Sequence, residues 1–295
     1  MKIGLIDVDG HNFPNLALMK ISAYHKQQGD SVEWYSPMFS GHLDKVYMSK
    51  VFTFTPDYEY CIDADKIEKG GTGYKLYDKN LPEYMEHIFP DYSIYPQYDY
   101  AIGFLTRGCI RNCPWCVVPK KEGQICAYDT WQHIKRPDSK KIVFMDNNVL
   151  ASDHGISQIE EMSHEKNIRI DFNQGLDARL ITKDIAKMLA ACKWDKYLRV
   201  ACDRTQMLPV IRQALDYLEE YGMKPYKVWS YVLIEDVQDA HHRIVELSKM
   251  GIKPFAQPYI DFSGERKVDN EAKRLARWCN MKSTFNSCTF EEYTG

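Results

Sequence analysis

Residues 99–123 read DYAIGFLTRGCIRNCPWCVVPKKEG, and this stretch sets the pattern for most of the chain. The largely apolar segment 99–106 predicts a β-strand. Glycine, asparagine and proline then predict a loop, which carries Cys109, Cys113 and Cys116 in the spacing C-x3-C-x2-C. The sequence therefore predicts three thiols in one short loop that directly follows a strand.

The same order of strand and loop recurs along the rest of the chain, with helical stretches in between. Six strands are predicted, at residues 99–106, 141–146, 168–173, 196–202, 226–234 and 252–259. Apolar stripes predict two of the helices, one through Leu208, Ile211, Leu215 and Leu218 and one through Ala240, Ile244 and Leu247. Such units imply parallel strands with right-handed crossovers, in an open sheet or a partial barrel. In both folds reactive groups lie after the carboxyl ends of the strands, where the cysteines fall.

The first part of the chain predicts a small Rossmann-like α/β domain. Residues 2–8 form an apolar run, Asn15 is a candidate helix N-cap, and a helix is expected up to Gly29. Further strands are predicted at residues 31–37, 46–54 and 62–69. The sequence thus begins with a β-α-β unit, which is how a doubly wound sheet opens.

A segment rich in tyrosine and proline, residues 90–100, separates the two parts. We therefore expect one domain at residues 1–95 and a second at residues 96–295, which includes a C-terminal extension. The tyrosines of this segment, at positions 92, 95, 98 and 100, are expected to pack between domains, with stacking on a substrate base as the alternative.

Composition narrows the class of protein. The 295 residues are 44% hydrophobic and 27% charged, which excludes disordered, collagen-like and coiled-coil chains. A formal charge of −3 argues against non-specific nucleic-acid binding, and no nucleic-acid module is recognised. No run approaches the roughly 20 apolar residues that span a bilayer, so a cytoplasmic protein without a membrane partner is expected. Nine cysteines without an export signal are then expected to be reduced thiols.

Three thiolates in one loop have a specific chemical use. They can hold three irons of a cubane cluster and leave the fourth iron open to a substrate or cosubstrate. Basic side chains in the loop are expected to keep the thiols deprotonated; they are Arg107, Arg111, Lys120 and Lys121. A structural zinc site needs four ligands, and no second pair of cysteines or suitably spaced histidine follows. A zinc-stabilised, non-enzymatic binding module is the alternative of another class.

The cysteine loop after the first of six β/α units, with an aromatic residue before the last cysteine, resembles the radical S-adenosylmethionine (SAM) superfamily over residues 99–290. The resemblance implies a partial (β/α)6 barrel of the TIM type. It implies that Cys109, Cys113 and Cys116 ligate a [4Fe-4S] cluster whose open iron binds SAM. Reductive cleavage of SAM would then start hydrogen abstraction from a substrate that the sequence does not identify. A one-electron reductant such as flavodoxin or ferredoxin is the implied partner.

The resemblance also suggests cofactor-binding residues, although it assigns no catalytic residue beyond the cluster loop. Trp115 is expected beside the adenine of SAM. Where the family often has Gly-Gly-Glu after its second strand, this chain has Asp146 and Asn148, whose oxygens can accept from an ammonium group. Later strand ends supply further candidates for the ribose or methionine portion, namely Asn173, Gln174, Asp177 and Asp203, with Arg204 beside the last. The alternative is that these residues cap the helices that follow.

The first domain resembles a shortened version of the cobalamin-binding domain that precedes some radical SAM cores. Asp9 and His11 follow its first strand, and GGTGY at residues 70–74 follows a later one, where glycines let a nucleotide tail approach the backbone. His11 is expected in a loop or capping role, with a cobalt ligand as the alternative. A cobalamin-dependent methyltransferase or rearrangement enzyme is thus the alternative within the enzyme class.

Four other residues with metal-binding side chains are expected to have no cofactor role. Cys279 and Cys288 are interpreted as ordinary thiols, because they lack the partners that an auxiliary cluster needs. His241 and His242 lie in a predicted helix and are expected at its surface.

Overall fold

The computed structural model describes residues 1–261 and 268–295, and the chain divides into two compact units. The first unit holds residues 1–99, and the second holds the described residues from 100 onward. Residues 96–99 belong with the first unit because Gln97 and Tyr98 donate side-chain hydrogen bonds to the His11 carbonyl, at 3.3 and 2.7 Å. The division therefore falls four residues after the position expected from composition.

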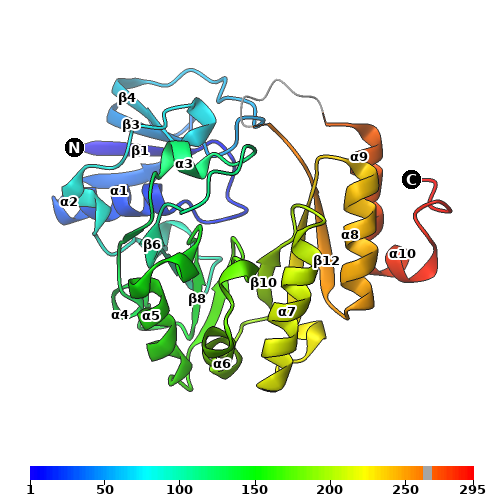
Figure 1. Cartoon of the computed structure of the whole chain (residues 1–295). Coiled ribbons are helices and arrows are strands. Elements are labelled where there is room, and N and C mark those ends of the chain that lie inside the picture. The colour runs from blue at the N-terminus through cyan, green and yellow to red at the C-terminus, as the bar shows by residue number, and fades with distance from the viewer. Residues whose placement is uncertain (262–267) are drawn as a thin grey trace. The chain divides into compact units, whose positions relative to one another are not determined.

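The first unit is built on a parallel four-stranded sheet in the order β2-β1-β3-β4 (Figure 1). The strands are β1 (Lys2–Asp7), β2 (Ser31–Trp34), β3 (Leu43–Ser49) and β4 (Ala64–Gly70). The connecting helix α1 (Leu16–Gln27) begins as predicted, because the Asn15 side chain accepts from the Leu18 N–H at 3.3 Å. The rest of the unit has short helices only: η1 (Thr72–Tyr74), α2 (Glu83–Glu86) and η2 (Tyr92–Ile94).

The strand expected at residues 46–54 is wrong in its second half. Strand β3 ends at Ser49, and Val51 and Phe52 are exposed in a loop. The Asp9 carboxylate accepts from the backbone N–H groups of both residues, at 2.5 and 3.3 Å, and so removes them from any strand ladder. An apolar local sequence predicted a strand, but a carboxylate from the end of β1 takes the donors that the ladder needs.

The second unit contains six parallel strands at the predicted places. They form two sheets, in the orders β5-β8-β9 and β10-β11-β12. The strands are β5 (Ala101–Gly103), β8 (Lys141–Phe144), β9 (Arg169–Phe172), β10 (Leu198–Ala201), β11 (Val228–Ile234) and β12 (Lys253–Pro258). Isolated parallel bridges, Ile170 to Trp194 and Leu176 to Val200, connect the β9 and β10 regions. Among the described strands β12 does not pair with β5, so no closed barrel forms. The prediction of an α/β protein with parallel sheets is confirmed.

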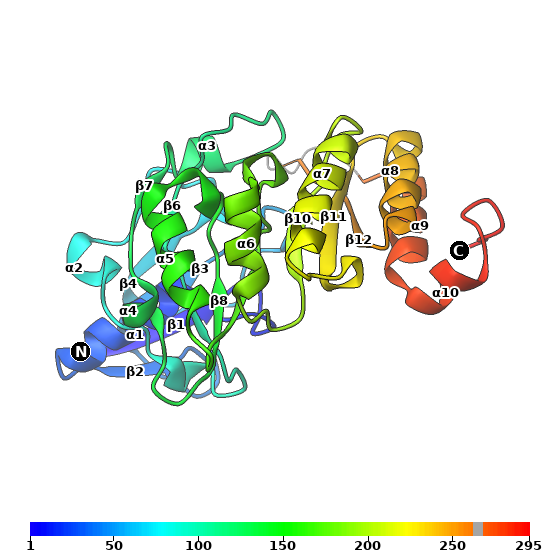
Figure 2. The same ribbon diagram turned by 60° about the horizontal axis from the view of Figure 1, so that its bottom comes forward.

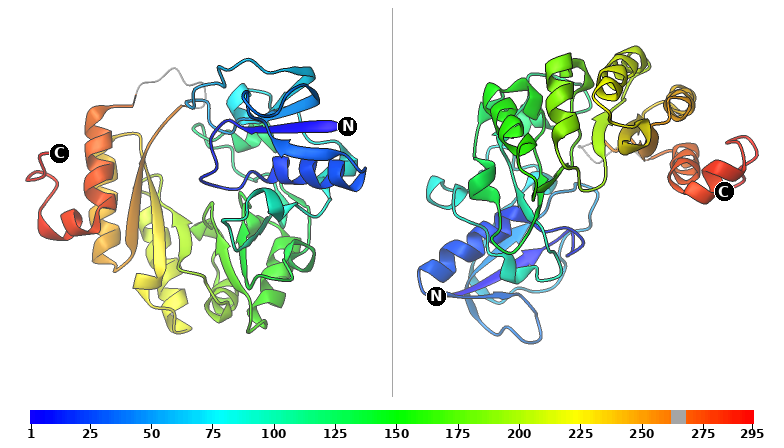
Figure 3. Two further views of the ribbon diagram at one scale, coloured as in Figure 1. Left: turned by 180° about the vertical axis from the view of Figure 1, so that it is seen from behind. Right: turned by 90° about the horizontal axis from the view of Figure 1, so that it is seen from below.

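The helices of the second unit follow its strands. The longer ones are α5 (Asp153–Ser163), α6 (Lys183–Ala191), α7 (Met207–Glu220), α8 (Val237–Lys249) and α9 (Asn270–Asn280). Shorter helices are α3 (Val118–Lys121), α4 (Trp131–Ile134), α10 (Lys282–Ser287), η3 (Val149–Ala151), η4 (Ala178–Leu180) and η5 (Pro225–Lys227). Helices α5 to α8 form a row along one side of the strands (Figures 2 and 3). None of the described helices has the length and apolar character needed to cross a membrane.

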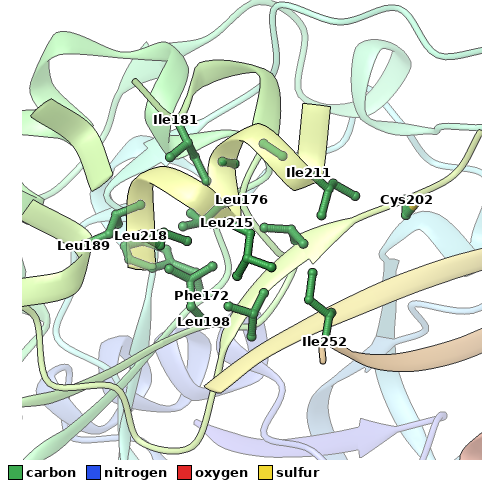
Figure 4. Close-up of a cluster of buried hydrophobic side chains, with 14 of the residues drawn as sticks. Phe172, Leu176, Ile181, Leu189, Leu198, Cys202, Ile211, Leu215, Leu218 and Ile252 are labelled. Atoms are coloured by element: carbon green, nitrogen blue, oxygen red, sulfur yellow. The ribbon is translucent and has the colours of Figure 1, made fainter. Parts of the chain in front are cut away.

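A continuous apolar core lies between this row of helices and the strands (Figure 4). Leu198 of β10 packs there with Phe172 of β9, and the predicted stripe of α7 contributes Ile211 and Leu215, all of them buried. Each such side chain contributes roughly 1.5–3 kcal/mol when it is fully buried. This core fixes the carboxyl ends of the strands, and the loops of the candidate site start from those ends.

Candidate functional site

The cysteine loop is closed at its base by a short antiparallel ribbon. Strand β6 (Thr106–Arg107) pairs with β7 (Cys126–Ala127), which places Arg107 opposite Cys126. Gly108 has a φ of +83°, and a Cβ on it would lie 2.2 Å from the Gln124 carbonyl oxygen, so only glycine fits. The Cys109 N–H donates to the Gly123 carbonyl at 3.2 Å. The three cysteines thus lie on a loop whose two ends are held together.

All three thiols are free and partly buried. Burial raises the pKa of both Cys113 and Cys116, and for Cys113 the charge of Arg179 opposes this effect. The basic side chains expected to keep the thiols deprotonated therefore do not bring the pKa of Cys113 or Cys116 below its usual value. Arg107 donates two hydrogen bonds to Glu122, at 2.6 and 2.8 Å, and Arg111 pairs with Asp177 at 3.0 Å. Each arginine thus has its charge balanced by a carboxylate.

Asp146, at the end of β8, holds the backbone that leads into the loop. Its buried carboxylate accepts from the N–H of Leu105 at 3.0 Å, and from the N–H and hydroxyl of Thr106 at 2.6 and 2.7 Å. Burial raises the pKa of Asp146 to about 6, although these donors oppose the shift. Its oxygens are therefore engaged with the chain itself, and this residue acts as an internal anchor.

Asn148, two residues further, reaches a cysteine directly. Its Nδ2 lies 3.4 Å from the Cys109 sulfur and donates a hydrogen bond to it. The other polar atom of this amide, Oδ1, is buried and has no hydrogen-bond partner in the described structure. Since buried polar atoms are nearly always paired, this oxygen marks an acceptor left open beside Cys109.

The ends of β9 and β10 also contact the loop. Asp177 caps η4, and besides Arg111 it binds Arg179 through Nε at 2.6 Å. Burial acts to raise the pKa of Asp177, but the two guanidinium groups outweigh it and lower the pKa below its usual value. After β10, the Arg204 guanidinium lies 4.4 Å from the centre of the Trp115 ring. A cation at this distance from an indole is attracted by its π-face, so each of these strand ends holds one part of the loop.

The remaining predicted cofactor-binding residues have weaker links to the loop. Asn173 donates to the Met145 sulfur at 3.9 Å, and its carbonyl accepts from the Tyr231 hydroxyl at 2.8 Å. Gln174 is exposed. Burial raises the pKa of Asp203, although Arg243 opposes the shift, and the Asp203 charge acts on both Cys113 and Cys116. Neither Asn173 nor Gln174 has a hydrogen bond to the loop among the described interactions.

Two arginines that bear on the site were missed by the sequence analysis. Arg179 binds Asp177, and its position two residues after that aspartate was the available signal. Arg243 lies on α8 and is only 1% exposed. It donates to the carbonyls of Cys202 and Leu233 and pairs with Asp239 at 2.7 Å, and so holds the carboxyl ends of β10 and β11. A charged residue inside an apolar helical stripe was the signal for this role.

No metal site is preassembled in the described part of the chain. Across residues 1–261 and 268–295, no three or more His, Cys, Asp or Glu side chains are grouped so that they could hold an ion. In this structure the three thiols of the cysteine loop are therefore not grouped around a common point.

In the first unit, the glycines of the turn after β4 are required by close contact with another segment of the same chain. Gly71 has a φ of +101°, and a Cβ there would lie 2.2 Å from the Lys50 carbonyl oxygen; Gly73 is similarly close to Lys50. The close backbone approach that these glycines permit is thus to the chain itself. His11 is exposed, with its ring 4.2 Å from that of Trp34, in keeping with a loop role.

Four other residues singled out in the sequence analysis make their described contacts with parts of the chain other than the cysteine loop; they are Cys279, Cys288, His241 and Tyr95. Cys279 is buried, which raises its thiol pKa to about 12, and Cys288 donates to the Thr284 carbonyl. His241 is not fully at the surface as expected, because it packs against Trp278. Tyr95 is buried within the first unit, and its hydroxyl donates to Asp7 at 2.6 Å.

Comparison with known proteins adds no relative to this description. A scan against protein-family models finds no family that matches the chain, and a search of curated proteins finds no match.

Proposed function

We propose that this protein is a radical SAM enzyme that acts on a substrate not yet identified. One observation carries the proposal: a loop with three free thiols in the spacing C-x3-C-x2-C is bonded to the carboxyl ends of three successive parallel strands. In parallel α/β folds this edge is where ligands bind and reactions take place. Three cysteines without a fourth leave one corner of a [4Fe-4S] cluster open.

The fold supports a partial (β/α)6 barrel as the finer description of the second unit. The two sheets place the six strands in chain order, β5-β8-β9 and β10-β11-β12, and parallel bridges link them. Each crossover carries helices, and the longer ones lie on one side of the strands (Figure 2). Six parallel strands in sequential order, with helices outside, are what such a barrel requires.

The donor set fits the two groups that the proposal requires. Cys109, Cys113 and Cys116 would hold the cluster, and the unpartnered Asn148 Oδ1 can accept from the ammonium group of SAM. When bound, these groups supply a one-electron reductive cleavage of a sulfur–carbon bond, which starts hydrogen abstraction. The thiols are not gathered in advance, so assembly requires the loop to reorient its sulfurs.

The residues around the loop then have definable roles. Asp146 fixes the backbone at Leu105 and Thr106, which leads into the loop. The Arg111–Asp177 pair joins the loop to the end of β9, and Arg204 covers the Trp115 ring. These contacts hold the loop against the strand ends, and radical chemistry needs such a fixed site in order to avoid side reactions.

Anaerobic reconstitution tests the proposal. The wild type should bind about four irons per chain and release 5′-deoxyadenosine from SAM when a strong reductant is added. Cys113→Ala should lose both properties. Cys126→Ala is the matched control, since Cys126 is an exposed thiol at the base of the same loop and lies outside the proposed ligand set. One zinc and no iron in folded wild-type protein would instead support the zinc-stabilised binding module.

A further inference from the structure

Cys109 differs from the other two cysteines of the loop in how its sulfur is bonded. Its Sγ accepts from the backbone N–H of Arg111 at 3.3 Å and from the side-chain Nδ2 of Asn148 at 3.4 Å. Within the described chain, no side chain donates a hydrogen bond to the sulfur of Cys113 or Cys116. One thiol of the three is therefore tied to a strand end outside its own loop.

The Asn148 donor is held in place by buried surroundings. The residue is only 2% exposed, and its neighbours Val149 and Leu150 are also buried. Its carbonyl accepts from the Ala151 N–H at 3.0 Å, which starts η3. Because Oδ1 has no partner, the bond to Cys109 is the one hydrogen bond that this side-chain amide makes in the described structure. The amide therefore faces the Cys109 sulfur with its Nδ2 atom.

We infer that Asn148 is a positioning residue that fixes the Cys109 sulfur and raises the reduction potential of a cluster bound there. This inference rests on the proposed function. A ligating thiolate that accepts an N–H bond carries less electron density, so the reduced, more negative cluster is stabilised. The donor comes from the end of β8 and not from the cysteine loop, so it can hold the Cys109 sulfur while the loop reorients. Asn148 thereby favours electron uptake by the cluster.

The test compares the reconstituted full chain with two Asn148 variants and one control. Asn148→Ala removes the donor, and Asn148→Asp removes it while the volume stays the same. Asn147→Ala is the control, because Asn147 is partly buried in the same segment and its side chain has no hydrogen bond among the described interactions. The readouts are iron per chain and the cluster's midpoint potential, from a redox titration followed by electron paramagnetic resonance.

Asn148→Ala should weaken electron uptake about tenfold, which is a shift of about 59 mV to more negative potential for a one-electron couple. Asn148→Asp should shift it further, because its carboxylate adds negative charge beside the sulfur, and Asn147→Ala should match the wild type. Folded Asn148 variants that lose iron also support the inference, since Cys109 is then no longer held. If the alanine variant unfolds, the aspartate variant decides.

Two results would overturn the inference. One of them leaves the proposed function intact, and the other rejects the proposed function as well. Asn148 variants with full iron and the wild-type potential reject the role of Asn148 and leave the proposed function intact. A folded wild-type chain that assembles no iron–sulfur cluster rejects both.

Discussion

The two units of this protein end their parallel sheets in opposite ways. In the first unit the carboxyl edge is closed by the chain itself: Asp9 accepts from Val51 and Phe52, and Gly71 packs against the Lys50 carbonyl. In the second unit the same edge bears three free thiols and a buried oxygen of Asn148 without a partner. A buried polar atom that already has its hydrogen-bond partner offers a ligand no free bonding position, whereas an unpaired buried atom offers one.

This contrast has an energetic side. A buried acceptor without a partner costs about 1–3 kcal/mol, a large fraction of the few kcal/mol by which a domain is stable. The second unit carries that cost at Asn148, while Asp146 and Asp177 nearby each accept several hydrogen bonds. An open acceptor within an otherwise satisfied network is the pattern expected of a ligand site.

The largest effect is expected at the base of the cysteine loop, from Gly108→Ala. The new Cβ would collide with the Gln124 carbonyl, and the left-handed backbone adds strain of about 1–3 kcal/mol. Because 1.4 kcal/mol is a factor of about ten in an equilibrium constant, we expect iron retained after reconstitution to fall about tenfold or more. Iron analysis of the folded variant measures this.

Gly123→Ala is the matched control for the loop. Gly123 also has a positive φ, of +72°, but no heavy atom lies within 4 Å of the position of its Cβ. This variant has the backbone strain without the collision, so it should lose much less iron. Equal losses in the two variants would mean that the close approach at Gln124 does not hold the loop.

The effect expected at Asp146 is on the pH dependence of stability and not on iron binding. Burial raises its pKa from 3.8 to about 6. The unfolded chain therefore releases this proton at a lower pH than the folded chain does. The protonated group adds to the free energy of unfolding below pH 3.8, and this contribution is lost as the pH rises to about 6. A shift of this size corresponds to about 3 kcal/mol. Asp146→Asn should remove this component from the difference in unfolding free energy between pH 4 and pH 7.

Chemical denaturation at several pH values measures the difference. Asp153→Asn, at the exposed start of α5, is the control and should keep the wild-type profile. Parallel profiles for the wild type and Asp146→Asn would mean that the carboxyl group is not desolvated, and the anchor at Leu105 and Thr106 would then need another explanation.

Local patterns predicted much of the fold. Alternating burial along β11 and the apolar stripe of α7 are properties of neighbouring residues, so the sequence places both elements correctly. The strand expected at residues 46–54 failed in its second half because Asp9, more than 40 residues away, binds the backbone there. Such a contact between distant segments leaves no trace in a local window.

The site divides in the same way. The family resemblance suggested Asp146, Asn148 and Asp177 at the strand ends, and each of them does lie against the loop or the segment leading into it. Their partners were not predictable, because the Arg111–Asp177 pair joins residues 66 positions apart. Arg243 was missed because a buried charge in an apolar stripe is rare, and its function depends on carbonyls at two strand ends.

The smallest effect on iron binding is expected in the first unit, from Gly71→Ala. Its φ of +101° and the Lys50 carbonyl 2.2 Å from the position of its Cβ should destabilise this unit by about 1–3 kcal/mol. Gly70→Ala is the control, since nothing lies within 4 Å of its Cβ position and its φ is not in the left-handed region. Thermal unfolding measures the loss, and iron bound after reconstitution should be the same in both variants. A Gly71→Ala chain that unfolds like Gly70→Ala would mean that the turn does not pack on Lys50, and the glycines would again be free to admit a ligand.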